Sequence, residues 1–556
     1  MRLGLPPRAE TRITGTAERS GEYRRRISQA VRPPAAVAFD AGLAASLLLV
    51  GGLLRWDGWD RQSFWSDEMS SLGRATVRLR EIVPGVLAFD GHPPLYIFAV
   101  HFGYYTFHLG PIGSVRIPSL IFGTAVIPVV YLLARALAGR LAAVVASLLV
   151  VGSPIAVWYS RDGRMYALTW FLVMLSFLLL AQVARSRRWV WLALYAASVT
   201  GALYADVSAV IALAPQAALI TWFFAVDRQA RQAWLTIGGA YVAGWLMFSP
   251  WLLVLPQQVP LLHGTFPGYE PGWMTVWQLV LNETGLMASY AYLWFLIVPA
   301  LVGVTMLALY GAAIIIVLRC LRAAPLFGAV TLALTVGPAV MCGAFLLLLN
   351  APGVLTPRVM GIAAFGLALA AGGAVQFGWD ALHPRVSVGR AGLAAAGLAA
   401  GALALVSGTW VALHTMNSSG WVGESWQQVA PFLQARVQPT DAIIYYPIGT
   451  KILVDPYLPA SSSVVRDGVG IWSAPHDMAE SYFARWAAGH DRVWFVYLAA
   501  GGIDMPVHDG WLATQGYTRV FGDPNQQCGV LLYARAGISA TVSGHLPSPL
   551  CGKGGP

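Results

Sequence analysis

Long apolar runs recur along most of the chain, separated by short polar stretches that often contain arginine. Runs of about 18 or more apolar residues can cross the roughly 30 Å hydrocarbon core of a bilayer as helices that satisfy their own backbone hydrogen bonds. They lack the alternation that a β-barrel requires. The pattern predicts an all-α polytopic membrane protein. The predicted spans cover residues 36–54, 115–135, 141–158, 168–184, 189–205, 207–226, 234–255, 293–318, 326–349, 358–378 and 391–413.

The arginines orient these spans. Residues 1–35 are polar and arginine-rich, which predicts a disordered basic cytoplasmic tail. The apolar stretch 93–109 is interpreted as a helix on the outer surface, because counting it as a span would place the later basic clusters outside. With that helix on the surface, the chain has about 11 transmembrane helices, an inner N-terminus and an outer C-terminus.

The last part of the chain, residues 414–556, changes character and predicts a small extracytoplasmic α/β domain. It follows the tail 1–35 and a transmembrane part 36–413 that contains the outer loop 55–114. Cys528 and Cys551 either pair, if this part faces an oxidising compartment, or remain thiols. The predicted elements are helices over 424–437 and 477–488 and strands over 441–446, 492–498 and 528–533.

Charge and composition narrow the possible partners. Hydrophobic residues make up 57% of the chain, charged residues make up 11%, and the formal net charge is +10. A basic chain can bind nucleic acid, but here the arginines stand at the ends of apolar runs, as expected for residues that set membrane orientation. Nucleic acid is therefore not an expected partner.

Two adjacent carboxylates, Asp67 and Glu68, follow the first span in a weakly charged chain. A partly desolvated carboxylate at that place can take a proton from a hydroxyl group. The more common alternative is an acidic pair that only solvates a loop. His92 begins a His-Pro-Pro-Leu-Tyr motif in the same loop, where two prolines fix the backbone, although a lone histidine is more often an ordinary polar residue. Tyr204 and Asp206, at another outer turn, are candidates for the same cavity, or Asp206 is a solvating group at a helix end.

Arginines on the predicted outer face need a reason other than membrane orientation. Arg161, Arg164 and Tyr166 form an Arg-x-x-Arg-x-Tyr pattern in a short outer turn, and Arg358 stands at the outer mouth of a late span. The planar donor groups of arginine are suited to phosphate recognition. For Arg358 alone, a snorkelling side chain is an equal explanation.

Together, the acidic pair, the His-Pro-Pro-Leu-Tyr motif, the Arg-x-x-Arg-x-Tyr turn and the late arginine resemble the GT-C superfamily of integral membrane glycosyltransferases. The likeness is to the branch that includes protein O-mannosyltransferases and the aminoarabinose transferase of lipid A, and it covers about residues 36–413. It implies a polyprenyl-phosphate sugar donor whose phosphosugar enters a cavity at the outer face. It further implies Asp67 as the general base and Glu68 as its assistant or as a ligand of the acceptor. The implied donor-phosphate or substrate contacts are His92, Arg161, Arg164, Tyr166 and Arg358.

The chain also departs from that branch. It has no inserted segment the size of the lumenal trefoil domain of protein O-mannosyltransferases, which favours a glycan or lipid acceptor over a protein. His92 stands where the lipid A transferase has a lysine, so the protonation state at this position stays open. The first outer loop contains no Asp-x-Asp pattern. No cofactor or catalytic metal is therefore expected.

The composition, rich in Ala, Gly, Arg and Trp, resembles that of actinobacterial proteins. The expected function is transfer of a sugar, most simply mannose from polyprenyl-phosphomannose, to an envelope glycan or lipoglycan outside the plasma membrane, for example as mannose caps of lipoarabinomannan. The nearest alternative is an arabinosyltransferase that uses polyprenyl-phosphoarabinose. From another class, a transporter or flippase of lipid-linked sugars would need ionisable residues deep within several spans. A third reading is a receptor or scaffold that binds envelope glycan.

Overall fold

The structure, a computed structural model, describes most of the helical part and the core of the C-terminal part. The described residues are 34–61, 66–89, 91–186, 188–257, 324–349, 361–382, 426–446, 450–454, 465–468, 484–485, 487–498, 509–522 and 528–538.

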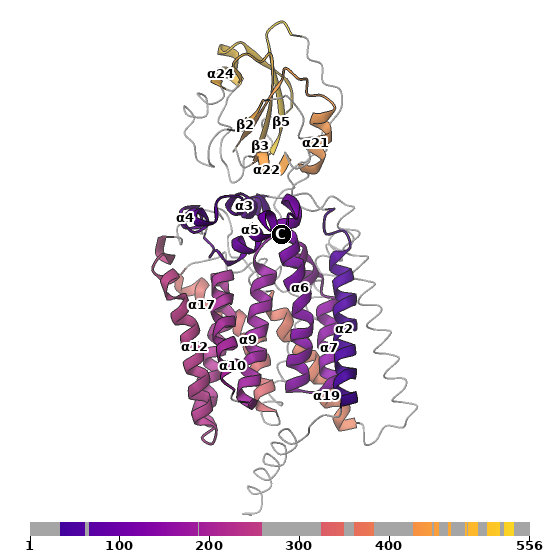
Figure 1. The fold of residues 1–556 in the computed structure, drawn as a ribbon, viewed down its shortest axis with the longest axis vertical. Helices are drawn as coiled ribbons and strands as arrows, with labels where there is room; N and C mark the ends of the chain where they lie inside the picture. Colours follow the sequence, from indigo (N-terminus) through magenta and orange to yellow (C-terminus); the bar gives the residue numbers. More distant parts are fainter. Residues whose placement is uncertain are drawn as a thin grey trace, which may run out of the picture.

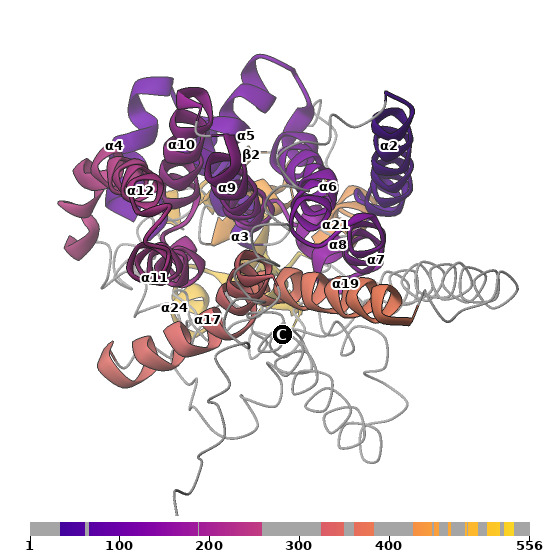
Figure 2. The same ribbon diagram turned by 90° about the horizontal axis from the view of Figure 1, so that it is seen from below.

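A bundle of long helices forms the larger part of the molecule (Figure 1). The helix α9 lies between α6 and α10 and packs against both, whereas α2 lies at the edge of the bundle (Figure 2). Within the described residues, six helices are long and apolar enough to cross a membrane, or seven spans if α7 and α8 form one broken span. The bundle consists of α2 (Pro34–Trp56), α6 (Gly110–Leu137), α7 (Arg140–Val151), α8 (Pro154–Arg161), α9 (Tyr166–Ser186), α10 (Trp189–Ala205), the 3₁₀ turn η1 (Val207–Ala209), α11 (Val210–Val226), α12 (Arg231–Leu252), α17 (Pro325–Leu349) and α19 (Ile362–Leu382).

Most predicted spans in the described part coincide with helices to within a few residues, because a long apolar run is sufficient to specify a membrane helix. The predicted spans 293–318 and 391–413 lie outside the described residues, so the count of 11 stays a prediction. Arg358 and Cys551 also lie outside them.

The predicted single span 141–158 is wrong in detail. It consists of α7 and α8, which meet at an angle of 57°. The side chain of Ser153 accepts a hydrogen bond from the backbone N–H of Ala156, and Pro154 occupies the first turn of α8. A serine cap followed by proline is a strong helix start, so a new helix begins here. As a result, Arg161 is the last residue of α8 and not part of a turn.

Three short helices lie across one end of the bundle: α3 (Ser66–Ala75), α4 (Leu79–Phe89) and α5 (Leu95–Tyr105) (Figure 1). They replace most of the predicted loop 55–114, which therefore is not irregular. The predicted surface helix 93–109 corresponds to α5. With 11 residues, α5 is about 16 Å long, too short to cross a bilayer.

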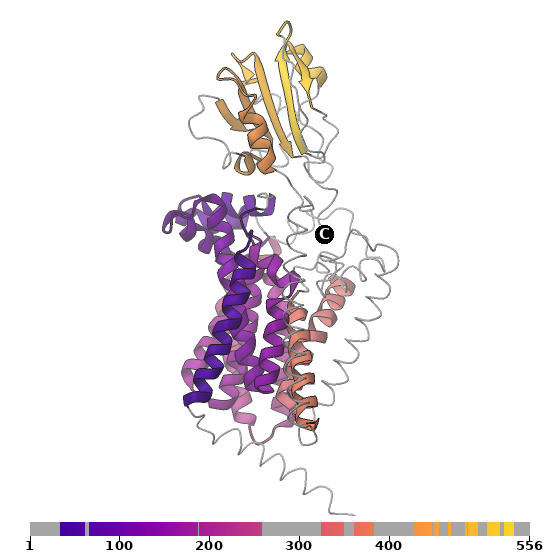
Figure 3. The same ribbon diagram turned by 90° about the vertical axis from the view of Figure 1, so that its right-hand side faces the viewer.

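The C-terminal part contains a five-stranded sheet with the order β2-β1-β3-β5-β4 (Figure 3). The strand β1 pairs in parallel with β2 and β3, while β5 is antiparallel to β3 and β4. The sequence patterns predicted β1, β3, β5 and α21, but missed β2 and β4; the predicted helix 477–488 lies mostly outside the described residues. The helix α22 packs against α3. The elements are α21 (Trp426–Gln434), β1 (Ala442–Tyr446), α22 (Thr450–Val454), β2 (Val465–Gly468), β3 (Arg492–Leu498), α24 (Asp509–Thr514), β4 (Tyr517–Phe521) and β5 (Cys528–Arg535).

At the other end of the bundle, Asp40 of α2 ties three helices together. Its carboxylate accepts hydrogen bonds from Arg140 Nε at 2.6 Å, from Arg135 Nε at 3.1 Å and from the Tyr131 hydroxyl at 3.2 Å. The two arginines lie in or beside predicted basic turns, but the sequence pattern did not indicate that Asp40, inside the first apolar run, is their partner.

We expect Asp40→Asn to lower the free energy of unfolding by about 2 kcal/mol, because charge-assisted hydrogen bonds are lost and two arginines keep their mutual repulsion. Detergent-solubilised native and variant proteins would be compared by thermal unfolding. An unchanged melting temperature would show that this cluster is not stabilising.

Candidate functional site

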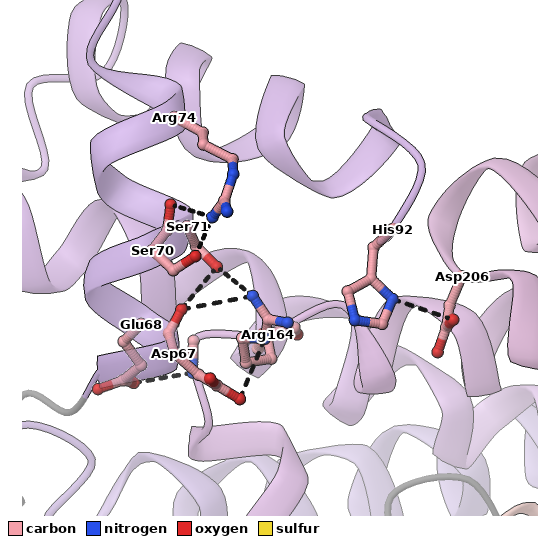
Figure 4. A network of polar contacts seen from close by, with 10 residues as sticks. Asp67, Glu68, Ser70, Ser71, Arg74, His92, Arg164 and Asp206 are labelled. Carbon is pink, nitrogen blue, oxygen red and sulfur yellow. Dashed lines mark hydrogen bonds and ion pairs between the residues drawn. The ribbon is translucent and has the colours of Figure 1, made fainter. Parts of the chain in front are cut away.

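The helix α3 places Asp67 and Glu68 in its first turn, where carboxylates interact favourably with the helix dipole. Successive residues of a helix point about 100° apart. The two carboxylates therefore enter different surroundings, and Figure 4 shows Asp67 beside Arg164 and Glu68 farther from it.

Glu68 is completely buried in an ion pair with Arg116 of α6. Arg116 Nε lies 2.6 Å from one carboxylate oxygen and Nη2 lies 2.6 Å from the other, and both side chains are 1% exposed. The backbone N–H of Gly163 also donates to Glu68, at 2.8 Å. Glu68 thus fastens α3 to α6 and to the turn before α9. This position suits a structural anchor better than the predicted assistant base.

Asp67 remains accessible, because its side chain is 35% exposed. Its Oδ2 lies 3.9 Å from Arg164 Nε. Arg164 Nη1 donates to the Ser71 hydroxyl at 3.2 Å and to the backbone carbonyl of Asp67 at 3.4 Å. A nearly buried guanidinium group is thereby held next to a half-exposed carboxylate (Figure 4). Asp67, the predicted base, and Arg164, a predicted phosphate contact, therefore lie side by side, and their roles stay predictions.

Two other predicted residues serve the scaffold. Arg161 is buried and donates to the carbonyl oxygens of Arg55 at 3.1 Å and of Leu54 at 2.7 Å, which caps the C-terminal end of α2. Tyr166 is also buried, with its ring edge-to-face against Tyr159 at a centroid distance of 5.3 Å. Neither contact places the side chain beside Asp67.

His92 precedes α5 and pairs with Asp206, which lies between α10 and η1. His92 Nδ1 lies 3.5 Å from Asp206 Oδ1, and the side chains are 26% and 4% exposed. Burial raises the pKa of Asp206, but hydrogen bonds and charge from His92 and hydrogen bonds from Ser208 lower it more, so that the net shift is downward. Asp206 is therefore ionised at neutral pH.

Tyr96, four residues after His92, is linked through Ser119 to the backbone of Arg164. Its hydroxyl lies 2.7 Å from the Ser119 hydroxyl, which donates to the backbone carbonyl of Arg164 at 2.9 Å. Burial raises the pKa of Tyr96, which keeps the phenol neutral. The His-Pro-Pro-Leu-Tyr motif thus contributes both a half-exposed imidazole and a buried tether at one end of the bundle.

The sequence interpretation missed Arg116. The available signal was a single arginine near the start of a long apolar run, a position that requires an acidic partner. No group of three or more His, Cys, Asp or Glu side chains gathers within the described residues.

Gly163 has no room for a side chain. A Cβ atom there would lie 2.9 Å from Glu68 Oε1 and 2.9 Å from Val115 Cβ. We expect Gly163→Ala to destabilise the protein by about 1–3 kcal/mol, because the fixed Glu68–Arg116 pair must shift. The matched control is Gly85→Ala in α4, where a Cβ atom meets nothing within 4 Å. Thermal unfolding should show a loss for the first variant and no loss for the second.

The chain is similar to known membrane proteins. A family model described as dolichyl-phosphate-mannose-protein mannosyltransferase matches residues 91–254, a range that includes His92, Arg164 and Asp206. The apo crystal structure of ArnT from Cupriavidus metallidurans has a TM-score of 0.54 and 15% sequence identity, with 90% of this chain and 98% of that chain covered. The crystal structure of ArnT from the same organism bound to undecaprenyl phosphate has a TM-score of 0.50 and 15% identity, with 92% and 100% covered.

A more distant similarity is to the archaeal oligosaccharyltransferase AglB from Archaeoglobus fulgidus in complex with an inhibitory peptide and a dolichol-phosphate. Its TM-score is 0.46 and its identity 12%, with 82% of this chain and 69% of that chain covered. None of the curated protein sequences matches this chain.

Proposed function

We propose that the chain belongs to the GT-C superfamily of integral membrane glycosyltransferases, in its ArnT-like branch, and that it transfers a sugar from a polyprenyl-phosphate donor to an acceptor hydroxyl group. The family-model match over residues 91–254 and the similarity of the fold to that of ArnT support this proposal. One observation carries the proposal. Of the two adjacent carboxylates, Glu68 is buried in its pair with Arg116, whereas Asp67 is 35% exposed and lies 3.9 Å from Arg164.

In this mechanism, Asp67 is the general base. It takes the proton of the acceptor hydroxyl as the oxygen attacks the anomeric carbon, and the bond from that carbon to the phosphate oxygen breaks. A single displacement inverts the configuration relative to the donor. Arg164 and His92 stabilise the negative charge that develops on the leaving lipid phosphate, an effect that is strong where the charges are held in place before the reaction. Arg358 is proposed as a further donor contact from the sequence pattern alone.

The donor is proposed to be polyprenyl-phosphomannose. The description of the matching family model, which names dolichyl-phosphate-mannose, supports this sugar, and ArnT bound to undecaprenyl phosphate supports a polyprenyl carrier. We propose an envelope glycan or lipoglycan as the acceptor, such as lipoarabinomannan, and an active site that faces outside the plasma membrane. The arginine distribution supports that orientation.

The test is transfer of radiolabelled sugar in membranes that contain the native chain. Polyprenyl-phosphomannose and polyprenyl-phosphoarabinose are offered separately, with lipoglycan or peptide as acceptor, and membranes with equal amounts of Asp67→Asn serve as the control. Mannose transfer to lipoglycan by the native chain alone is the expected result. Transfer of arabinose only, or to peptide only, would correct the substrate. If neither donor supports transfer, but the lipid-linked sugar moves across the bilayer of vesicles that contain the protein, the proposed function would be a transporter and not an enzyme.

A further inference from the structure

The pairing of His92 with Asp206 joins two segments that are far apart in the sequence. His92 stands before α5, and Asp206 stands where α10 ends. The carboxylate is 4% exposed, whereas the imidazole is 26% exposed and lies at the same end of the bundle as Asp67. The buried partner therefore belongs to the scaffold, and the accessible partner faces the site.

Asp206 is held firmly by its own neighbours. Its Oδ1 accepts from the backbone N–H of Ser208 at 3.0 Å, and its Oδ2 accepts from the Ser208 hydroxyl at 2.5 Å. These contacts make Asp206 the cap of η1. Capping needs only an oxygen acceptor, and asparagine caps a helix about as well as aspartate. A full negative charge at such a buried place requires a cation, and among the described residues the partner found is His92.

We propose that Asp206 is a positioning residue for the donor phosphate, acting through His92. The Asp206 carboxylate accepts from Nδ1–H of the imidazole and so holds the ring in one orientation. The second ring nitrogen then points to the side of Arg164 (Figure 4). Between Asp206 and a bound lipid phosphate, His92 would then donate one N–H to each anion. The inference rests on the proposed function and goes further, because it assigns a role to the carboxylate behind the histidine.

The charges around the site support this arrangement. Arg164 has Asp67 at 3.9 Å, and His92 has Asp206 at 3.5 Å. A further arginine of the network, Arg74, donates to the backbone carbonyl of Ser70 at 3.0 Å (Figure 4). Without the charge of Asp206, the imidazole would lose the anion that orients it towards the donor phosphate.

The test measures the affinity of the purified, detergent-solubilised full chain for undecaprenyl phosphate, which requires neither a sugar nor an acceptor. Asp206→Asn keeps the capping oxygen and removes the charge, and we expect it to raise Kd about 10- to 100-fold, the range of a charge-assisted hydrogen bond. The matched control is Ser208→Ala, which removes a hydrogen bond to Asp206 but leaves the charge and His92 in place. It should change Kd by less than about threefold.

A double-mutant comparison separates this role from simple capping. If Asp206 acts through His92, Asp206→Asn should cause little further loss in a His92→Gln background. His92→Lys should restore binding in the Asp206→Asn background, because an ammonium group carries its charge without the carboxylate. Equal losses in the native and His92→Gln backgrounds would overturn the inference, as would equal effects of Asp206→Asn and Ser208→Ala. If the native chain binds undecaprenyl phosphate tightly but transfers no sugar, the proposed function is overturned. The role of Asp206 is then still decided by the Kd values of these variants.

Discussion

Asp67→Asn is expected to lower the rate of sugar transfer by about 10²- to 10⁴-fold, the usual contribution of a general base. The amide is similar in size to the carboxylate but accepts no proton. The side chain of Asp67 is 35% exposed, and its Oδ2 lies 3.9 Å from Arg164 Nε, so the substitution removes little packing. Folding and affinity for undecaprenyl phosphate should therefore stay nearly unchanged. Initial rates with saturating donor, at equal protein concentration, measure the effect.

The matched control for this prediction is Asp60→Asn. Asp60 is an exposed acid in the segment that follows α2, and the same acid-to-amide change there should leave the rate within about twofold. Equal rates for the native chain and Asp67→Asn would remove Asp67 as the base. Equal losses in both variants would point to a general effect of negative charge at this face.

Glu68→Gln is expected to have the opposite signature, a loss of folded protein. The change leaves the guanidinium of Arg116, 1% exposed, without its anion. Breaking a buried ion pair on one side costs about 3–5 kcal/mol, because the remaining charge stays buried and uncompensated. Unfolding in mixed micelles by sodium dodecyl sulfate measures the loss. Any protein that does fold should retain a transfer rate closer to that of the native chain than Asp67→Asn does.

Two further variants make the Glu68 prediction specific. Glu81→Gln removes an acid whose side chain is 49% exposed and whose arginine partner is 3.9 Å away, and it should cost less than about 1 kcal/mol. The double variant Glu68→Met with Arg116→Met should be more stable than Glu68→Gln, because no charge is left buried. If Glu68→Gln is as stable as the native chain but transfers no sugar, Glu68 would be the base and Asp67 would not.

The difference between Asp67 and Glu68 shows what sequence patterns could not resolve. Both are acids in one short polar segment, and either could be the base on that information. The choice depends on Arg116, which is 48 residues further along the chain. Its buried guanidinium group donates to the carboxylate of Glu68. Arg161 illustrates the same limit. Its place in the Arg-x-x-Arg-x-Tyr pattern suggested phosphate binding, but the C-terminal end of α2, more than 100 residues earlier, lies within reach of its donors.

The sequence by itself determined most of the long apolar helices of the described part, and it predicted that the segment with Asp67 carries the chemistry. A span is specified locally, by the length of an apolar run against the thickness of the bilayer, and so α9 and α10 were located to within two residues. The short strand β4, with the polar sequence Tyr-Thr-Arg-Val-Phe, has no such local signature and exists only through its pairing with β5. Only the tertiary structure decided which carboxylate is exposed and which acid stands behind His92. Burial and ion pairing depend on side chains brought together from distant helices, and no single segment of the sequence contains both partners.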